Sequence, residues 1–546
     1  MEEIKDVDTV VKDIQNVLEA TAPEDIIEQE IKSIFERKFS TKFTQQQKSS
    51  GEVDTCIANL DCLPDTVLLK IFSNFSLPEL CHVSLVCKHW CWIVYDSELW
   101  RYVDLSRYKQ ITESHIVNLI QARLSPLLKT LDLSNREITP VIMNELSEHC
   151  HQLDTLVLRN CLLPAESANN EMVNASSIPD KLVRLDVRNF KQGFYFVHLI
   201  LEANDLSNLE CFGFGNNDFC PAFTEFHSIF RKMHALRVLE CVHCPTINDD
   251  QIKLFADELD CLESLVLTKC DNIAGPSLPY LIEKSKSLKS LNLSETKVTS
   301  EWLIQTPWED SFIEELDLSF CLYLDADGLT KSLPRIFTLK HLNLHNVGKS
   351  KGVTPALFQV AHKEASWPNL EVLCLRFCNK FTVDGLPFFE KLASLKYLSL
   401  RSCFKVSFLA VGDILKYLPH LQHLECGSLL LSQESISSDW INIFENTAQY
   451  CKMLKKLVLV KCAGIALYKI SDYRKQFERF FNLSNHLEVL CVLYSEESIV
   501  RLLQDAMKMT GKDLMVTDKP GLEIIPRFRH SLDTELNRER FKTFSV

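Results

Sequence analysis

The feature of this sequence that most limits its fold is a short hydrophobic pattern, LxxLxL, which returns at intervals of 25 to 33 residues. A period in this range indicates stacked structural repeats, because a single unit of this size cannot bury its own apolar side chains. The sequence therefore predicts a repeat array over most of the chain. The first positions of the pattern are Trp100, Leu128, Leu153, Leu182, Leu209, Leu236, Leu262, Leu288, Ile313, Leu339, Leu370, Leu395, Leu421, Leu454 and Leu487.

Each unit has the same internal plan. Residues 370–394, LEVLCLRFCNKFTVDGLPFFEKLAS, predict a short strand, a turn and then a helix around residues 383–392. In the LxxLxL frame the first, fourth and sixth residues point into the core, and the third, fifth and seventh point outward from the sheet. These are leucine-rich repeats. The predicted fold class is α/β: a helical N-terminal region followed by a curved solenoid with a parallel concave β-sheet and outer helices.

The repeat frame also explains much of the cysteine content, which is 21 residues. A small side chain is expected at the ninth position, where it turns inward between neighbouring coils. Cys241-Val-His-Cys244 has the spacing of half a zinc site, but no second pair follows it, so no metal site is expected. The ninth positions are Cys161, Asn217, Cys244, Cys270, Cys321, Cys378, Cys403 and Cys462.

Before the repeats, residues 60–100 contain three short helical patterns. Pro64 stands where a first helix would start, and its missing N–H does no harm there. Ser76 and Glu79 have the spacing of a capping box and predict the start of a second helix. So many large apolar groups in a short segment cannot all be buried internally, so part of this surface is expected to face a partner. The apolar faces consist of Leu68, Ile71, Phe72 and Phe75, then Leu80 and Val83, then Val86, Trp90 and Ile93.

This segment resembles the F-box motif in the order and spacing of Leu63-Pro64, Ile71-Phe72, Leu80, Val86-Cys87, Trp90 and Leu99-Trp100. With the repeats, the resemblance is to the F-box/leucine-rich-repeat family, the substrate-receptor subunits of SCF-type cullin-RING ubiquitin ligases. It implies that the F-box binds the Skp adaptor and, through it, the cullin and RING subunits. The alternative is a helical bundle that merely caps the repeats. The residues expected to bind the adaptor are Leu63, Pro64, Leu68, Ile71, Phe72, Leu80, Val86, Cys87, Trp90 and Trp100.

The expected domains are an acidic, flexible leader at 1–58, the F-box at 59–105, the solenoid at 106–512 and a C-terminal cap or tail at 513–546. The leader carries seven Lys or Arg against thirteen Asp or Glu, a composition typical of disorder. A partner-binding helix is the alternative there. The tail is expected either to cap the solenoid or to fold back into its concavity.

Arg376 and Arg401 occupy the same outward slot of adjacent repeats, so their strands should be about 5 Å apart. Two guanidinium groups at that distance suit a carboxylate or phosphate. This predicts a protein target with an acidic or phosphorylated degron. In the alternative, the two arginines solvate the face or pair with acids such as Glu425. The predicted substrate-binding residues are His345, Arg376, Phe377, Tyr397, Arg401 and His423.

Composition argues against other classes of protein. A formal net charge of -14 disfavours general binding to nucleic acid or to an anionic membrane. No apolar run reaches the roughly 18–20 residues that cross a bilayer, and a secretory signal is not recognisable. The expected location is cytoplasmic, nuclear or both. No Gly-rich phosphate loop is found, so no cofactor is expected.

The predicted function is that of a non-catalytic receptor subunit, with no catalytic residues of its own. Its repeats would hold a target for ubiquitination and proteasomal degradation, and transfer would be accelerated by proximity. The alternative is a leucine-rich-repeat scaffold or interaction protein that acts without ubiquitin transfer. An enzyme would need a convergent pocket of titratable groups, which no motif here indicates.

Overall fold

The computed structural model describes residues 63–124, 127–164, 178–191, 197–198, 201–202, 204–215, 227–348, 352–427, 441–460, 470–495, 497–510, 515–517 and 531–534. The chain divides into two compact units, residues 1–219 with 536–546, and residues 220–535. Each unit is described by itself. The predicted leader at 1–58 lies outside the described residues.

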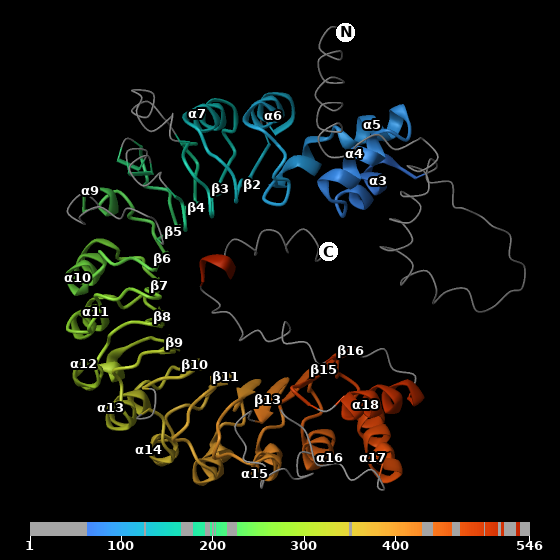
Figure 1. The fold of residues 1–546 in the computed structure, drawn as a ribbon. Coiled ribbons are helices and arrows are strands. Elements are labelled where there is room, and N and C mark those ends of the chain that lie inside the picture. Colours follow the sequence, from blue (N-terminus) through green and yellow to red (C-terminus); the bar gives the residue numbers. More distant parts are fainter. Residues whose placement is uncertain are drawn as a thin grey trace, which may run out of the picture. The chain divides into compact units, whose positions relative to one another are not determined.

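The described part of the first unit begins with the predicted helices, α3 (Asp65–Phe72), α4 (Leu77–Ser84) and α5 (Lys88–Val94), and a 3-10 helix, η2 (Ser97–Trp100) (Figure 1). Pro64 is the N-cap of α3. The backbone N–H of Ser76 donates to the Glu79 carboxylate at 2.6 Å, which closes the capping box of α4. Both predicted helix starts are confirmed. The prediction for Val86 was wrong: it lies before α5 rather than on its buried face, and it is 46% exposed.

The first unit continues with short parallel strands that pair in chain order. The strands are β1 (Tyr102–Asp104), β2 (Thr130–Asp132), β3 (Thr155–Val157), β4 (Arg184–Asp186) and β5 (Cys211–Gly215). The helical segments between them include α6 (Glu113–Leu119), the π-helical turn η3 (Ile120–Leu124) and α7 (Pro140–His149).

The second unit repeats this plan with strands β6 to β16, also parallel and paired in chain order. Equivalent repeat positions face each other, as with Leu342 opposite Leu373. The strands are β6 (Val238–Val242), β7 (Ser264–Val266), β8 (Ser290–Asn292), β9 (Glu315–Asp317), β10 (His341–Asn343), β11 (Val372–Cys374), β12 (Tyr397–Ser399), β13 (His423–Gly427), β14 (Lys456–Val460), β15 (Val489–Leu493) and β16 (Met515–Thr517).

The helices of the second unit lie on one side of its strands (Figure 1). The side of the sheet opposite the helices is called the inner face below. The predicted helix around residues 383–392 is a 3-10 helix, η8 (Val383–Lys391), with Pro387 inside it. The other helices are α9 (His227–Phe230), α10 (Asp249–Glu258), α11 (Leu278–Lys284), α12 (Ser300–Gln305), η6 (Trp308–Asp310), α13 (Ala326–Ser332), η7 (Leu333–Arg335), α14 (Pro355–Glu364), α15 (Phe408–Ile414), η9 (Leu415–Tyr417), α16 (Ile441–Tyr450), α17 (Ile470–Leu483) and α18 (Glu497–Met509).

The core follows the LxxLxL frame. Leu370, Leu373 and Leu375, at the first, fourth and sixth positions of one repeat, are all 0% exposed. Burying each such side chain contributes about 1.5–3 kcal/mol. The outward positions differ from the expectation of an open surface, since Ser399 and Glu425 are 0% and 1% exposed. Strands only about 4.8 Å apart let outward side chains of adjacent repeats shield one another.

The ninth-position cysteines form a buried ladder between the repeats, which confirms their predicted slot. The Cys321 thiol donates to the Leu293 carbonyl of the preceding repeat at 3.0 Å, and Cys403 donates to Leu375 at 2.9 Å. Burial raises the pKa of Cys321 to about 12, so the thiol stays protonated and unreactive. Cys241 and Cys244 are both buried in the core. The other buried members are Cys161, Cys270 and Cys378; Asn217 and Cys462 lie outside the described residues.

The residue just before the ninth position has a left-handed backbone in nearly every described repeat, with φ between 51° and 67°. This conformation turns the chain out of the strand. It costs most residues about 1–2 kcal/mol, and Asn tolerates it best among residues with a side chain. These eighth-position residues are Asn135, Asn160, Asn189, His243, Lys269, Glu295, Phe320, Asn346, Phe377, Ser402 and Tyr494.

Both alternatives for the C-terminal segment hold, within the second unit. Strand β16 pairs with β15 and so caps the sheet. Residues 531–534 return to the opposite end of this unit's sheet, where the backbone N–H of Leu532 donates to the Glu240 carboxylate of β6 at 2.7 Å.

Candidate functional site

The N-terminal helices of the first unit enclose a small core of their own. Leu68 and Phe72 are 0% exposed, and the Trp90 ring meets the Phe72 ring edge-on with centroids 5.3 Å apart. The Trp100 indole donates to the Val94 carbonyl at 2.9 Å. These packed rings fix how the three short helices sit against one another. Of the residues predicted to bind the adaptor, the structure places five in this core: Leu68, Phe72, Leu80, Trp90 and Trp100.

The other predicted adaptor-binding residues lie nearer the surface: Leu63, Ile71 and Cys87 are half-buried, and Pro64 and Val86 are exposed. Only these can touch a partner while the helices keep their fold. Adaptor contact stays a prediction for the whole set. For the buried members, the structure favours an indirect role, which is to hold the exposed side chains in place.

Large apolar side chains are exposed on these helices, which sequence reasoning mostly missed. Trp92 is 69% exposed, Leu85 49% and Val67 40%, beside Val86. Exposed apolar groups of this size mark an interaction site where they lie together. A signal was available: in α5 the residues Trp90 and Ile93 face the core, so helical spacing puts Trp92 on the solvent side. We call Val67, Leu85, Val86 and Trp92 the exposed apolar set.

On the inner face of the second unit, Arg376 is bound into a buried network. Its Nε donates to the Glu425 carboxylate at 2.8 Å and to the Ser399 hydroxyl at 3.1 Å, and its Nη2 also donates to Glu425. The Tyr397 hydroxyl lies 3.4 Å from Nη2. Arg376 is 7% exposed and Glu425 is 1% exposed. Strands β12 and β13 supply Tyr397, Ser399 and Glu425, and Arg376 follows β11.

This network corrects the predicted two-arginine clamp. The Arg376 fork is already occupied by Glu425, as the alternative interpretation held, and burial leaves no room for a further anion. Burial lowers the pKa of Arg376, but the neighbouring Glu425 carboxylate outweighs it and raises that pKa. Arg401 is half-buried, and burial together with the charge of Arg376 lowers its pKa.

The two histidines of the predicted substrate surface carry no positive charge near neutral pH. Burial, then the charges of Arg376 and Arg401, lower the pKa of His345 to about 4. Burial, then Lys456, lower the pKa of His423. Neutral imidazoles offer hydrogen bonds and ring faces rather than charge.

Beside the network, three rings form a row along the turns that follow the strands. The His345 ring lies 4.6 Å from the Phe320 ring and 5.6 Å from the Phe377 ring, with the second pair stacked at 19°. Phe320 and Phe377 are 37% and 38% exposed. Phe377 and His345 were among the predicted substrate residues, and Phe320 was missed. We call Phe320, His345 and Phe377 the aromatic row.

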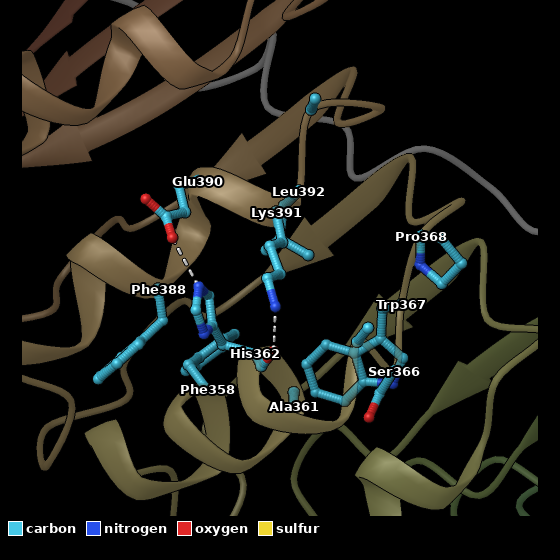
Figure 2. Close-up of a pocket in the computed structure, with 12 residues that line it drawn as sticks. Phe358, Ala361, His362, Ser366, Trp367, Pro368, Phe388, Glu390, Lys391 and Leu392 are labelled. Atoms are coloured by element: carbon cyan, nitrogen blue, oxygen red, sulfur yellow. Dashed lines mark hydrogen bonds and ion pairs between the residues drawn. The ribbon is translucent and has the colours of Figure 1, made fainter.

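A pocket of about 380 Å³ opens on the helical side, between α14 and η8 (Figure 2). Phe358, Trp367 and Phe388 provide aromatic walls. The His362 ring contacts the Glu390 carboxylate at 2.7 Å. This hydrogen bond joins neighbouring coils and is partly exposed, which is typical of a structural contact.

The described residues contain no group of three or more His, Cys, Asp or Glu side chains placed to hold a metal ion. Within the same ranges, no helix combines the length and apolar character needed to cross a bilayer.

Comparison with known proteins gives a family model described as F-box-like, which matches residues 60–106. F-box/LRR-repeat protein 12 of Bos taurus is 26% identical over 241 residues, 42% of this chain and 71% of that protein. The Mus musculus protein of the same name is 24% identical over 287 residues, 51% of this chain and 82% of that protein.

One chain of the crystal structure of the Rad7 and Elc1 complex in yeast covers 93% of this chain and 99% of its own length. Its TM-score of 0.45 and 14% identity are too low to carry any conclusion. The chain thus carries an F-box-like domain ahead of an α/β array of leucine-rich repeats, and it is similar to F-box/LRR-repeat proteins, as the resemblance predicted.

Proposed function

We propose that this chain is the substrate-recognition subunit of an SCF-type ubiquitin ligase. Its F-box helices bind a Skp-type adaptor, and through it the cullin and RING subunits, while its repeats hold a target protein. The observation that supports this best is an F-box-like domain whose helices expose Trp92, Leu85 and Val86 ahead of a long repeat array. Exposed aromatic and aliphatic groups of this kind serve as anchors at protein interfaces.

The chain acts without chemistry of its own. A target held on the repeats has its lysines kept near the conjugating enzyme, and the resulting effective concentration accelerates transfer. Two ninth-position thiols that could have served as nucleophiles, Cys321 and Cys403, are buried, and burial raises the pKa of each to about 12.

The target contacts the inner face of the second unit at the aromatic row, with Arg401 supplying charge beside it. This choice follows from exposure: Phe320 and Phe377 present ring surface, whereas Arg376 is paired internally. The preferred degron is therefore an apolar or aromatic segment with an acidic residue nearby, rather than a phosphate held by two arginines. The rings of the predicted residues Tyr397 and His423 lie 6.0 Å apart.

Adaptor binding is tested with the full chain and a purified Skp adaptor by calorimetry. The Trp92→Asp variant should bind at least tenfold more weakly, because it places a charge where an exposed ring makes contact. Phe337→Asp is the matched control, since Phe337 is also an exposed ring, at 49%, but lies in the repeats. Absence of binding by a folded wild-type chain, or equal loss in both variants, contradicts the proposal.

A scaffold without ubiquitin transfer is the competing function. Once a bound target is known, a reconstituted reaction with cullin, RING subunit, conjugating enzyme and adaptor separates the two. The proposal expects ubiquitin on the target only when the chain is present, with loss in the Trp92→Asp variant. A target that binds but receives no ubiquitin supports the scaffold instead.

A further inference from the structure

A short C-terminal segment is seated on the inner face of the second unit. Residues 531–534, Ser-Leu-Asp-Thr, form one turn in which the Ser531 hydroxyl accepts from the backbone N–H of Thr534 at 3.3 Å. The Leu532 side chain is 0% exposed. Its backbone N–H donates to Glu240, which lies 292 positions earlier in the chain, at 2.7 Å.

The receiving site has a definite chemistry. Glu240 is the fifth residue of its repeat, in β6, and is 3% exposed. Val238 lies two positions before it on the same face, and Val266 is its partner in β7. Both valines are nearly buried. A buried carboxylate beside aliphatic side chains requires a hydrogen-bond donor, and it suits a segment that brings an aliphatic side chain together with a backbone N–H. We call Val238, Glu240 and Val266 the Glu240 notch.

We propose that residues 531–534 are a resident, displaceable ligand of the Glu240 notch, and that the notch recognises a leucine-bearing peptide segment. The contact includes the buried Leu532 side chain and a hydrogen bond from its uncharged backbone N–H, and a segment of this length is small beside the interfaces of stable complexes. Because the tethered segment is always at high effective concentration, it excludes an equivalent segment from another chain until it is displaced. The idea that a target protein displaces this segment rests on the proposed function. The binding of residues 531–534 to the Glu240 notch does not rest on it.

The test uses a fluorescein-labelled peptide with the sequence of residues 527–539, RFRHSLDTELNRE, and fluorescence anisotropy with the full chain. The wild-type chain should bind the peptide weakly, since its own segment occupies the notch. The Leu532→Asp chain, whose segment can no longer bury its side chain, should bind it at least tenfold more tightly. A peptide carrying the same Leu-to-Asp change should bind neither chain.

Two further variants assign the site. Leu483→Asp is the matched control, because Leu483 is 45% exposed on α17 and its replacement should leave peptide binding at the wild-type level. Adding Glu240→Gln to the Leu532→Asp chain should weaken the peptide about tenfold. If Leu532→Asp does not fold, a chain that ends at residue 530 takes its place, and hydrogen exchange of residues 238–242 with and without peptide gives a second readout.

The proposal is overturned if a folded chain that lacks the Leu532 contact binds the peptide no more tightly than the wild type. It is also overturned if tight peptide binding survives the Glu240→Gln change. No adaptor or ubiquitin enzyme takes part in this assay. Its failure is therefore separate from a failure of the ligase function, which the Trp92→Asp measurement addresses.

Discussion

The two units place different side chains at the left-handed eighth position of their repeats. In the first unit the left-handed eighth position is Asn135, Asn160 and Asn189. Their amides form a ladder: Asn160 donates to Asn135 at 3.1 Å, and Asn189 donates to Asn160. In the second unit the same position varies in residue type, and it includes Phe320 and Phe377, whose rings are partly exposed on either side of His345.

This difference distinguishes turn residues that serve the fold from turn residues that we expect to bind a partner. Asparagine fits the left-handed backbone and also satisfies its own polar groups, so the ladder needs no partner. Phenylalanine gains no hydrogen bond from that conformation and carries its strain with part of the ring in solvent. The fold requires the left-handed conformation at this position but not a phenylalanine there, so we infer a binding surface at the aromatic row rather than at the ladder.

The buried carboxylates of the two units also differ, in how far their arginine partners are exposed to water. In the first unit Asp186 is 0% exposed, and both its partners reach water: the side chains of Arg159 and Arg188 are 31% and 17% exposed. In the second unit Glu425 and Arg376 are 2% and 9% exposed in their side chains. Loss of the acid therefore strands a buried cation only in the second unit.

The largest effect should come from removing these acids. Glu425→Ala should lower the free energy of unfolding by about 3–5 kcal/mol, because it leaves the Arg376 charge buried without its carboxylate. Asp186→Ala should cost about half as much, because Arg159 and Arg188 can turn toward solvent. Urea denaturation followed by circular dichroism measures both.

The control is the double variant Arg376→Met/Glu425→Leu, which removes the whole ion pair. It should recover most of the stability, since an apolar pair of similar volume replaces a buried pair at little cost. Equal losses for the two alanine variants would remove the distinction between the two carboxylates.

A smaller effect depends on pH, and it should be specific to His345. Its pKa is about 4 in the folded chain, against about 6.5 when unfolded, so the unfolded state binds more protons between these values. The contribution to stability is complete above pH 6.5 and is lost as pH falls toward 4. After allowance for partial exposure it amounts to about 2 kcal/mol. The equivalent residue Ser134 of the first unit has no ionisable side chain.

His345→Phe keeps a ring between Phe320 and Phe377 and removes the titrating group. The free energy of unfolding of this variant should change less between pH 4 and 6.5 than that of the wild type, by the amount above. The same slope in both chains would assign the acid sensitivity to other groups.

The repeats could be predicted from the sequence because the environment of each position depends on local sequence alone. The period placed Leu373 in the core and Cys321 between coils, and capping-box spacing placed the start of α4 at Ser76. These features depend on a pattern that repeats or on neighbours within four residues. The fold class follows from them directly.

The candidate sites depended on contacts that no period encodes. Arg376 and Glu425 are 49 residues apart, and which of several acids receives a guanidinium fork depends on side-chain rotamers. Leu532 meets Glu240 across 292 residues, from a tail without repeat pattern. Trp92 was missed for a different reason. Matching a motif identifies residues by their spacing and not by their exposure, so this ring, which is 69% exposed, was passed over.

The smallest change in stability should come from exchanging the two kinds of turn. Phe377→Asn relieves the left-handed strain, worth about 1 kcal/mol, but loses ring stacking worth about 0.5–1.5 kcal/mol. The free energy of unfolding should therefore change by less than about 0.5 kcal/mol. Asn160→Phe has no such offset: it adds about 1 kcal/mol of strain and breaks both ladder hydrogen bonds, so it should cost about 2 kcal/mol or more.

Thermal denaturation of the two variants beside the wild-type chain measures this asymmetry. If Phe377→Asn destabilised the chain as much as Asn160→Phe, the ring would be a structural part of the turn. A near-neutral Phe377→Asn means that the fold does not need this phenylalanine. Its ring is then free to serve a partner, and the same variant becomes the one in which to measure loss of target binding.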